Sequence, residues 1–114
     1  MTNLKLGLCK GRHSISEVAD YIFETELNPT NVTEINELAY ERLHALFPQT
    51  SIIGCTFAYG VDGTKVYRGD LTLYVTGLTV ALVSVINNCK DLGINLVLMH
   101  FNRDTNDYFE QRVY

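Results

Sequence analysis

Apolar and polar positions alternate along the second half of the chain in a way that predicts strands and helices in turn. Residues 71–75 have strand composition, residues 79–90 carry apolar side chains at helical spacing, and residues 94–100 are again apolar. Gly93 stands where a residue in the left-handed conformation would end the helix. Two strands separated by a helix form a β-α-β unit, in which the strands are parallel and the crossover is right-handed.

The first half of the chain predicts two further strands and one further helix. Residues 4–9 are short, apolar and followed by turn-prone residues, and residues 21–23 have strand composition. Asn31 is a suitable helix cap, and Glu34 three residues later completes a capping box. Apolar residues then recur at helical spacing until Pro48, where we expect the helix to end.

Two β-hairpins interrupt this alternation. Residues 51–69 contain Asp62-Gly63, a favoured tight-turn pair, between two segments of strand composition, and a last hairpin turns at residues 104–107. We expect the 51–69 hairpin to be an insertion that forms an arm or a lid. Residues 1–114 then make a single α/β domain: a small, Rossmann-like, mostly parallel sheet with two main helices and two β-hairpin excursions.

The segment 78–89 is apolar nearly all round a helical cylinder, because Val80 and Val83 extend the main apolar stripe. A helix of this kind is covered on two sides. One cover is the sheet, and we expect the other to be a partner subunit. A homodimer, or a higher homo-oligomer, through residues 78–89 is therefore the expected assembly.

Composition limits the possible classes of function. The 114 residues, 46% hydrophobic and 19% charged, are typical of one globular domain with a modest core. A formal net charge of −4 provides no general basic field for duplex DNA or RNA. The amino-terminal residues lack the pattern of a signal peptide, and no apolar run reaches the roughly 18 residues of a membrane span. We therefore expect a cytoplasmic protein that does not bind duplex nucleic acid or a membrane.

The three cysteines, Cys9, Cys55 and Cys89, are widely spaced among apolar neighbours. Buried free thiols in a reducing compartment explain them better than disulfides or a zinc site. No set of Cys, His, Asp and Glu residues has the spacing of a zinc or calcium site, so we expect neither a metal nor a cofactor.

Basic and polar residues follow three of the predicted strands. Because ligands of open parallel sheets bind beyond the carboxyl ends of the strands, we expect these residues to share one pocket. The turn from Thr76 to Thr79 opens a helix whose first N–H groups and positive dipole end favour an anion, with Thr79 as the cap. The candidate ligand-binding residues are Lys10, Gly11, Arg12, His13, Thr76, Gly77, Thr79, His100, Asn102 and Arg103.

Specific roles can be assigned to some of these side chains. Arg12 and Arg103 suit two-pronged pairing with a phosphate, and Asn102 suits a base or ribose edge. A base could stack on one of three aromatic residues, Tyr21, Phe23 or Phe101.

Each feature also has a purely structural explanation. The turn from Thr76 to Thr79 fits an ordinary strand-to-helix connection equally well, since it lacks the Gly-Lys-Ser/Thr ending of a P-loop and the three-glycine dinucleotide fingerprint. Arg12 and Arg103 also suit surface ion pairs.

No catalytic constellation is complete in the sequence. Cys9 and His13 lie near each other, but Cys9 belongs to an apolar strand, where a thiolate is disfavoured. If the protein is an enzyme, His13 or His100 would be the proton-transfer group acting on a phosphodiester.

The segment LTLYVTGLT at residues 71–79, followed by an apolar helix, resembles the strand-turn-helix of CRISPR-associated Rossmann-type (CARF-like) sensor domains. Those domains bind cyclic oligonucleotide messengers at a dimer interface, and some cleave them. The combination of GLCKGRH, YVTGLTVALV and HFNRDT is similar to small uncharacterised proteins of phages and prophages in Gram-positive bacteria. Both resemblances imply a protein that senses or sequesters a nucleotide signal, in phage defence or counter-defence.

The sequence therefore predicts a protein that senses or sequesters a nucleotide-derived, phosphate-bearing small ligand, such as a cyclic nucleotide or oligonucleotide messenger. Two alternatives stay open. One is a phosphodiesterase, similar to a ring nuclease, that cleaves such a messenger. The other is a protein–protein interaction protein without a small ligand.

Overall fold

A computed structural model of the chain describes residues 2–11, 15, 17–48 and 67–114. Most of the expected 51–69 hairpin and two of the candidate site residues, Arg12 and His13, lie outside these ranges. The elements follow one another in the order β1 (Thr2–Cys9), β2 (Tyr21–Phe23), α1 (Val32–Leu46), β3 (Gly69–Tyr74), α3 (Thr79–Leu92), β4 (Ile94–Asn102) and β5 (Asp107–Arg112).

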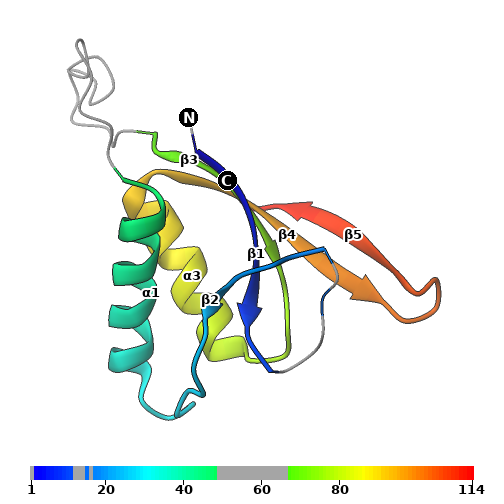
Figure 1. The fold of residues 1–114 in the computed structure, drawn as a ribbon, viewed down its shortest axis with the longest axis horizontal. Coiled ribbons are helices and arrows are strands. Elements are labelled where there is room, and N and C mark those ends of the chain that lie inside the picture. The colour runs from blue at the N-terminus through cyan, green and yellow to red at the C-terminus, as the bar shows by residue number, and fades with distance from the viewer. Residues whose placement is uncertain (1, 12–14, 16, 49–66) are drawn as a thin grey trace.

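The strands form one five-stranded sheet in the order β2-β1-β3-β4-β5. The first four strands are parallel, and β5 returns antiparallel to β4 as the second arm of the carboxyl-terminal hairpin. The expected α/β fold, with a mostly parallel sheet and two helices, is confirmed (Figure 1).

Leucines line the face of the sheet that the helices cover. Leu6 of β1 pairs with Leu73 of β3, which in turn pairs with Leu98 of β4, so the three side chains form a row across the sheet. All three are buried in the core cluster together with residues of both helices. Figure 1 shows α1 and α3 packed side by side on this one side of the sheet. The opposite face has no helix among the described residues.

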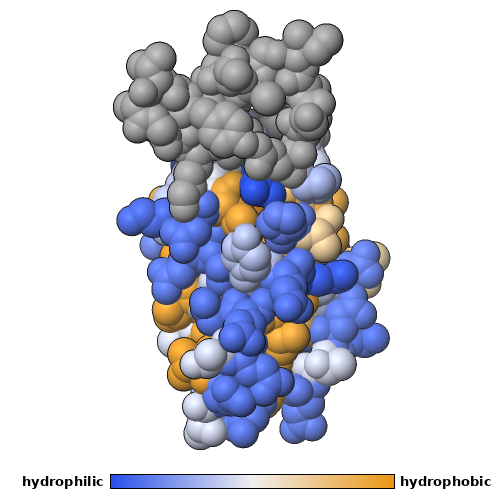
Figure 2. Space-filling model, turned by 90° about the vertical axis from the view of Figure 1, so that its left-hand side faces the viewer, coloured by the Kyte–Doolittle hydropathy of each residue, from blue (hydrophilic) through white to orange (hydrophobic). Residues whose placement is uncertain are grey.

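Helix α1 begins where the sequence predicts. The side chain of Asn31 accepts a hydrogen bond from the backbone N–H of Glu34 at 3.2 Å, and its amide donates to the Glu34 carboxylate at 2.8 Å. Every fourth residue then faces inward, with Ile35, Ala39 and Leu43 buried. Figure 2 views the molecule from the α1 side and shows a mainly hydrophilic surface broken by small hydrophobic areas. The outer face of α1 is therefore an ordinary solvated helix face.

Helix α3 is covered on two sides within the chain itself. It packs against β1 and β4 on one side and against α1 on another. Asn88 joins the two helices, because its amide donates to the side-chain oxygen of Asn36 at 3.1 Å. Gly93 ends α3 with φ of 74°, as the sequence predicts. The sheet and α1 thus cover most of the apolar pattern, whereas Val83 is 49% exposed. A homodimer through this helix stays a prediction.

No helix in the described ranges is long and apolar enough to cross a membrane. The longest, α1, has 15 residues, whereas a spanning helix needs about 20.

Part of the connection from β1 to β2, residues 15 and 17–20, lies over the face of the sheet that lacks helices. Tyr74 points to that face, since its neighbour Leu73 points to the helices. The charge of Glu17, in this connection, acts on both Tyr74 and Tyr108 and helps to raise their pKa values. Ile15, from the same connection, is buried. The connection therefore covers part of the open face near the carboxyl ends of the strands.

Candidate functional site

Connections leave the carboxyl ends of β1 and β3 on opposite faces of the sheet. The one after β1 crosses the open face to β2, whereas the one after β3 enters α3 on the helix face. Since β1 and β3 are neighbours, their carboxyl ends form a topological switch point. Open α/β sheets bind their ligands in the crevice at such a point, and the strand order found here is that of flavodoxin-like sheets. The predicted location of the site is therefore consistent with the topology.

Two hollows flank the turn that joins β3 to α3. The first hollow, of about 530 Å³, lies on the β1–β2 side and is lined by Cys9, Lys10, Gly11, Thr25, Glu26, Leu27 and Leu78. The second hollow, of about 390 Å³, lies toward the β4–β5 hairpin and is lined by Val75, Thr76, Gly77, His100, Phe101, Arg103 and Tyr108. The three strand ends do share one edge of the sheet, but the turn divides that edge in two.

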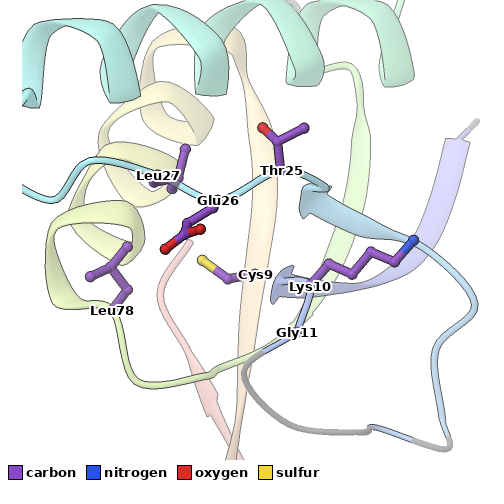
Figure 3. Close-up of a pocket in the computed structure, with 7 residues that line it drawn as sticks. All are labelled: Cys9, Lys10, Gly11, Thr25, Glu26, Leu27 and Leu78. Atoms are coloured by element: carbon purple, nitrogen blue, oxygen red, sulfur yellow. The ribbon is translucent and has the colours of Figure 1, made fainter.

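An acidic side chain dominates the first hollow. Figure 3 shows the carboxylate of Glu26 and the thiol of Cys9 pointing into it, while the side chain of Lys10 extends away. Gly11 lies at its margin with φ of 86°, a conformation that suits glycine. A carboxylate repels a phosphate at short range, so the first hollow is the poorer anion site of the two.

The second hollow combines a cation with aromatic rings. Arg103 supplies a guanidinium from the β4–β5 turn, and Phe101 supplies a ring that is 46% exposed. Phe101 meets the ring of Tyr108 edge-on at a centroid distance of 5.3 Å, and Tyr108 meets Tyr74 in the same way at 4.9 Å. These contacts hold the aromatic wall of the hollow in place.

The two tyrosines of this wall stay protonated. Burial raises the pKa of Tyr74, and the charge of Glu17 raises it further. The pKa of Tyr108 is raised by the same two causes, burial first. Both phenols are therefore neutral hydrogen-bond donors at physiological pH and add no negative charge beside Arg103.

The amino terminus of α3 opens without a side-chain cap. Leu78 is the cap residue, and its side chain cannot accept a hydrogen bond. Thr79 is instead the first helical residue, so the expectation that Thr79 caps the helix is wrong. The N–H of Leu82 donates to the Leu78 carbonyl at 3.1 Å as the first bond of the helix, so the N–H groups of residues 79–81 precede the hydrogen-bonded turns.

Thr76 and Gly77 differ sharply in their surroundings, although both line the second hollow. The Thr76 hydroxyl is buried and accepts a hydrogen bond from the backbone N–H of Cys9 at 3.3 Å. Gly77 is exposed, and a Cβ built there would meet nothing within 4 Å. Thr76 therefore supports the site, whereas Gly77 leaves open space for a ligand to approach the backbone.

The predicted site residues fall into four groups. Thr76, Gly77, His100 and Arg103 line the second hollow, and Lys10 and Gly11 line the first. Thr79 and Asn102 line neither, and the Asn102 side chain accepts a hydrogen bond from the Asp104 N–H at 3.0 Å, which stabilises the hairpin turn. Arg12 and His13 lie outside the described residues.

His100 already has neighbours within the hairpin. Its Nε2 lies 2.8 Å from the side-chain oxygen of Gln111, and its ring lies 5.3 Å from the ring of Phe109. The imidazole is thus held at the margin of the second hollow by two residues of β5. These two contacts fix the orientation of the His100 ring.

Sequence reasoning missed Tyr108 and Glu26. The predicted turn at 104–107 would place Tyr108 opposite Arg103, but the chain turns at 103–106, which pairs Tyr108 with Phe101. The turn prediction is therefore wrong by one residue, and this difference hides the role of Tyr108. Glu26 has no signal in the sequence, since its position depends on how the chain leaves β2. Of the other proposed stacking residues, Tyr21 covers Gly7 on the open face and Phe23 is buried in the core, so neither faces the second hollow.

Neither metal binding nor thiol chemistry has support among the described residues. No group of three or more His, Cys, Asp or Glu side chains lies close enough to hold a metal ion in these ranges. Cys9 and Cys89 are both buried and outside any disulfide, and burial raises the pKa of Cys89 to about 12. Cys55 lies outside the described residues.

Comparison with protein-family models, curated proteins and solved structures finds no significant match to this chain. A fold by itself does not determine a function, because functions depend on sites built on folds. The chemistry of the second hollow is therefore the basis for the functional argument.

Proposed function

We propose that the protein binds a nucleotide-derived, phosphate-bearing small ligand in the second hollow, as a sensor or a sink rather than as an enzyme. The observation that carries this proposal is the convergence of Arg103, Phe101 and the open turn at Gly77 on one hollow at the carboxyl edge of the sheet. A cation, an aromatic face and unbonded backbone N–H groups are the three elements that a nucleotide requires.

We place the ligand with its phosphate at the turn after β3 and its base on Phe101. Its phosphate lies against Gly77 and the guanidinium of Arg103, which both line the hollow. Its base lies on the exposed ring of Phe101, which Tyr108 holds from the side. The volume of about 390 Å³ is within the range of small-ligand sites.

The resemblance to CARF-like sensors and to phage proteins favours a cyclic nucleotide or oligonucleotide messenger as the ligand. Such messengers act in the cytoplasm, so we place the protein there, in phage defence or counter-defence.

A second candidate function is cleavage of the same ligand. It is favoured by His100, which lines the second hollow with its Nε2 held 2.8 Å from Gln111. An imidazole so placed could transfer a proton to or from a phosphodiester. Chromatography of messenger incubated with the protein separates the two functions: intact messenger supports a sink, and linear fragments that disappear in His100→Ala support an enzyme.

The decisive experiment is mass spectrometry of small molecules released when the purified protein is denatured. We expect an intact nucleotide to be released from the wild-type protein and not from Arg103→Ala. Lys90→Ala is the matched control, because Lys90 is an exposed cation in the last turn of α3, at the opposite end of that helix. Equal release from Arg103→Ala and Lys90→Ala would show that the ligand does not bind in the second hollow.

A further inference from the structure

Strand β5 is an open edge of the sheet. It contacts β4 and no other described element, and nearly all of its residues are exposed. Figure 1 shows the strand at the end of the sheet with no described segment beside it. A strand in this position presents a row of backbone donors and acceptors that another chain can use.

The hydrogen-bond pattern determines which residues present these groups. The N–H of Val113, just after β5, donates to the Leu96 carbonyl of β4 at 2.8 Å. Because antiparallel strands bond through alternate residues, Gln111 and Phe109 also direct their backbone groups toward β4. Tyr108, Glu110 and Arg112 therefore direct theirs away from it, toward the free edge. The N–H of Tyr108 already donates to the Asp107 carboxylate at 2.9 Å, so Glu110 and Arg112 are the main backbone partners for a second strand.

Exposed hydrophobic side chains gather in the same hairpin. Phe109 is 53% exposed, and Phe101 and Tyr114 are also among the large hydrophobic residues with high exposure. By contrast, the surface on the α1 side is mainly hydrophilic (Figure 2). Apolar side chains beside a free strand edge mark a surface that is covered in the working protein.

We propose that a second copy of the chain pairs with β5, antiparallel and about a two-fold axis at Gln111, so that the two sheets become continuous. This register brings Glu110 of each copy opposite Arg112 of the other. It also brings Phe109 opposite Val113, and Tyr108 opposite Tyr114. Two ion pairs and four apolar or aromatic pairs thus form from one self-complementary strand, because each pair occurs on both sides of the two-fold axis.

Charge selects this register over its neighbours. Sliding the second copy by two residues in one direction places Glu110 opposite itself, and sliding it the other way places Arg112 opposite itself. Like charges directly opposite each other are destabilising, and a slip of one residue would put each side chain on the wrong face. In the single chain the Arg112 guanidinium donates to the Tyr114 carbonyl at 3.1 Å, an exposed contact that pairing with Glu110 replaces.

The pairing also extends the candidate ligand site. Tyr108 lines the second hollow, and the register places Tyr114 of the second copy next to it. A third aromatic ring then continues the wall formed by Phe101 and Tyr108. This step rests on the proposed function, whereas the pairing itself does not.

Charge reversal tests the register directly. In Glu110→Arg, the new arginine of each copy faces Arg112 of the other copy. In Arg112→Glu, the new glutamate of each copy faces Glu110 of the other copy. Each variant should weaken its own dimer at least about tenfold, because two facing pairs change from attraction to repulsion. An equimolar mixture of the two variants should form a heterodimer, since each arginine then faces a glutamate. Sedimentation velocity and native mass spectrometry measure these states without any ligand.

A cysteine placed at the two-fold axis provides an independent test. Gln111→Cys brings two thiols face to face across the pair and should cross-link under mild oxidation. Asp107→Cys is the control, because the same register separates its two copies by more than the length of the paired region. Both are made in a Cys55→Ser background, in which the other thiols, Cys9 and Cys89, are buried.

Several results would overturn the proposal. The first is a wild-type protein that stays monomeric up to about 100 μM, a concentration well above the dissociation constants of most specific interfaces. The second is a dimer that survives both charge reversals, and the third is equal cross-linking at positions 111 and 107. A dimer that Val83→Glu disrupts and the β5 variants leave intact would assign the interface to α3, where Val83 is 49% exposed. Far-ultraviolet circular dichroism checks that each variant is folded, so that loss of the dimer is not loss of the fold.

Discussion

The backbone N–H of Cys9 donates a hydrogen bond to the hydroxyl of Thr76 at 3.3 Å, across 67 residues of sequence. This contact joins the carboxyl ends of β1 and β3 at the switch point of the sheet. Both residues are buried, so the bond forms away from water. It keeps the two strand ends together below the two hollows that flank the turn after β3.

Thr76→Val should destabilise the protein by about 1 kcal/mol, because a methyl group replaces the acceptor of this buried hydrogen bond at constant volume. Urea denaturation followed by circular dichroism measures the free energy of unfolding. Thr76→Ser is the control, since it keeps the hydroxyl. If valine and serine were equally stable, the hydrogen bond would contribute nothing to the fold.

Gly77 and Gly69 should respond in opposite ways to a methyl group. At Gly77 the added Cβ meets open space, so Gly77→Ala should leave the melting temperature unchanged while weakening nucleotide binding. At Gly69, with φ of 152°, the Cβ would overlap the carbonyl oxygen of Thr2, and alanine should destabilise by about 2 kcal/mol or more. Thermal melting and ligand titration are measured on both. Full ligand affinity in Gly77→Ala would mean that the ligand does not approach this turn.

Phe101 should provide much of the affinity for a base. Stacking on an aromatic side chain contributes about 1–3 kcal/mol per base, so Phe101→Ala should weaken binding by roughly 5-fold to 100-fold. Tyr40→Ala is a matched control, because Tyr40 is also an exposed aromatic residue, at 45%, but lies on α1. Isothermal titration with the released ligand gives both affinities. An equal loss in the two variants would argue against stacking on Phe101.

The sequence predicts the edge of the sheet that carries the site, because that inference needs only local patterns. A short apolar run, a turn and a helix can each be recognised within about ten residues, and the sheet rule then brings their ends together. Predicting that the turn divides this edge into two hollows requires information beyond local sequence patterns. The division depends on which face the β1–β2 connection crosses, and on Glu26, whose position follows from packing after β2.

The sequence misplaces one detail at α3, its cap. Thr79 has the composition of a cap, but the Leu78 N–H bonds to the Thr76 carbonyl at 2.8 Å, and this tight turn starts the helix one residue earlier. The apolar pattern of α3 indicates two covers, and α1 supplies one of them beside the sheet. Val83 is 49% exposed, and the subunit contact through this helix stays a prediction.

Asn88 should contribute more to the free energy of unfolding than its exposed neighbour Asn87. It is buried, and its amide donates to the side-chain oxygen of Asn36 at 3.1 Å and to the Ser84 carbonyl at 2.8 Å. Asn88→Ala should therefore cost about 1–3 kcal/mol, and Asn88→Asp more, because a carboxylate would face carbonyl oxygens. Asn87→Ala is the control and should change stability by less than about 0.5 kcal/mol. The measurement is the free energy of unfolding in urea. If Asn87→Ala and Asn88→Ala lowered it equally, the hydrogen bonds of Asn88 between α1 and α3 would not stabilise the fold.

Cys89 should make the protein less stable at alkaline pH. Burial raises the pKa of its thiol from 9.0 to about 12, so the unfolded chain loses this proton at a lower pH than the folded protein does. Stability from this group is complete below the unfolded pKa and falls as the pH rises toward the folded pKa, because the folded state binds more protons in that window. The loss should reach about 1.4 kcal/mol between about pH 8 and about pH 10.

Cys89→Ala isolates this contribution. The variant leaves a small cavity that lowers its stability at every pH, but it should lose about 1.4 kcal/mol less than the wild type over the same interval. Tyr74 and Tyr108, whose pKa values are also raised, act in the same direction in both proteins and cancel in the difference. The measurement is the free energy of unfolding in urea at the two pH values. Parallel pH profiles for the two proteins would show that the Cys89 thiol ionises as readily in the folded state as in the unfolded chain.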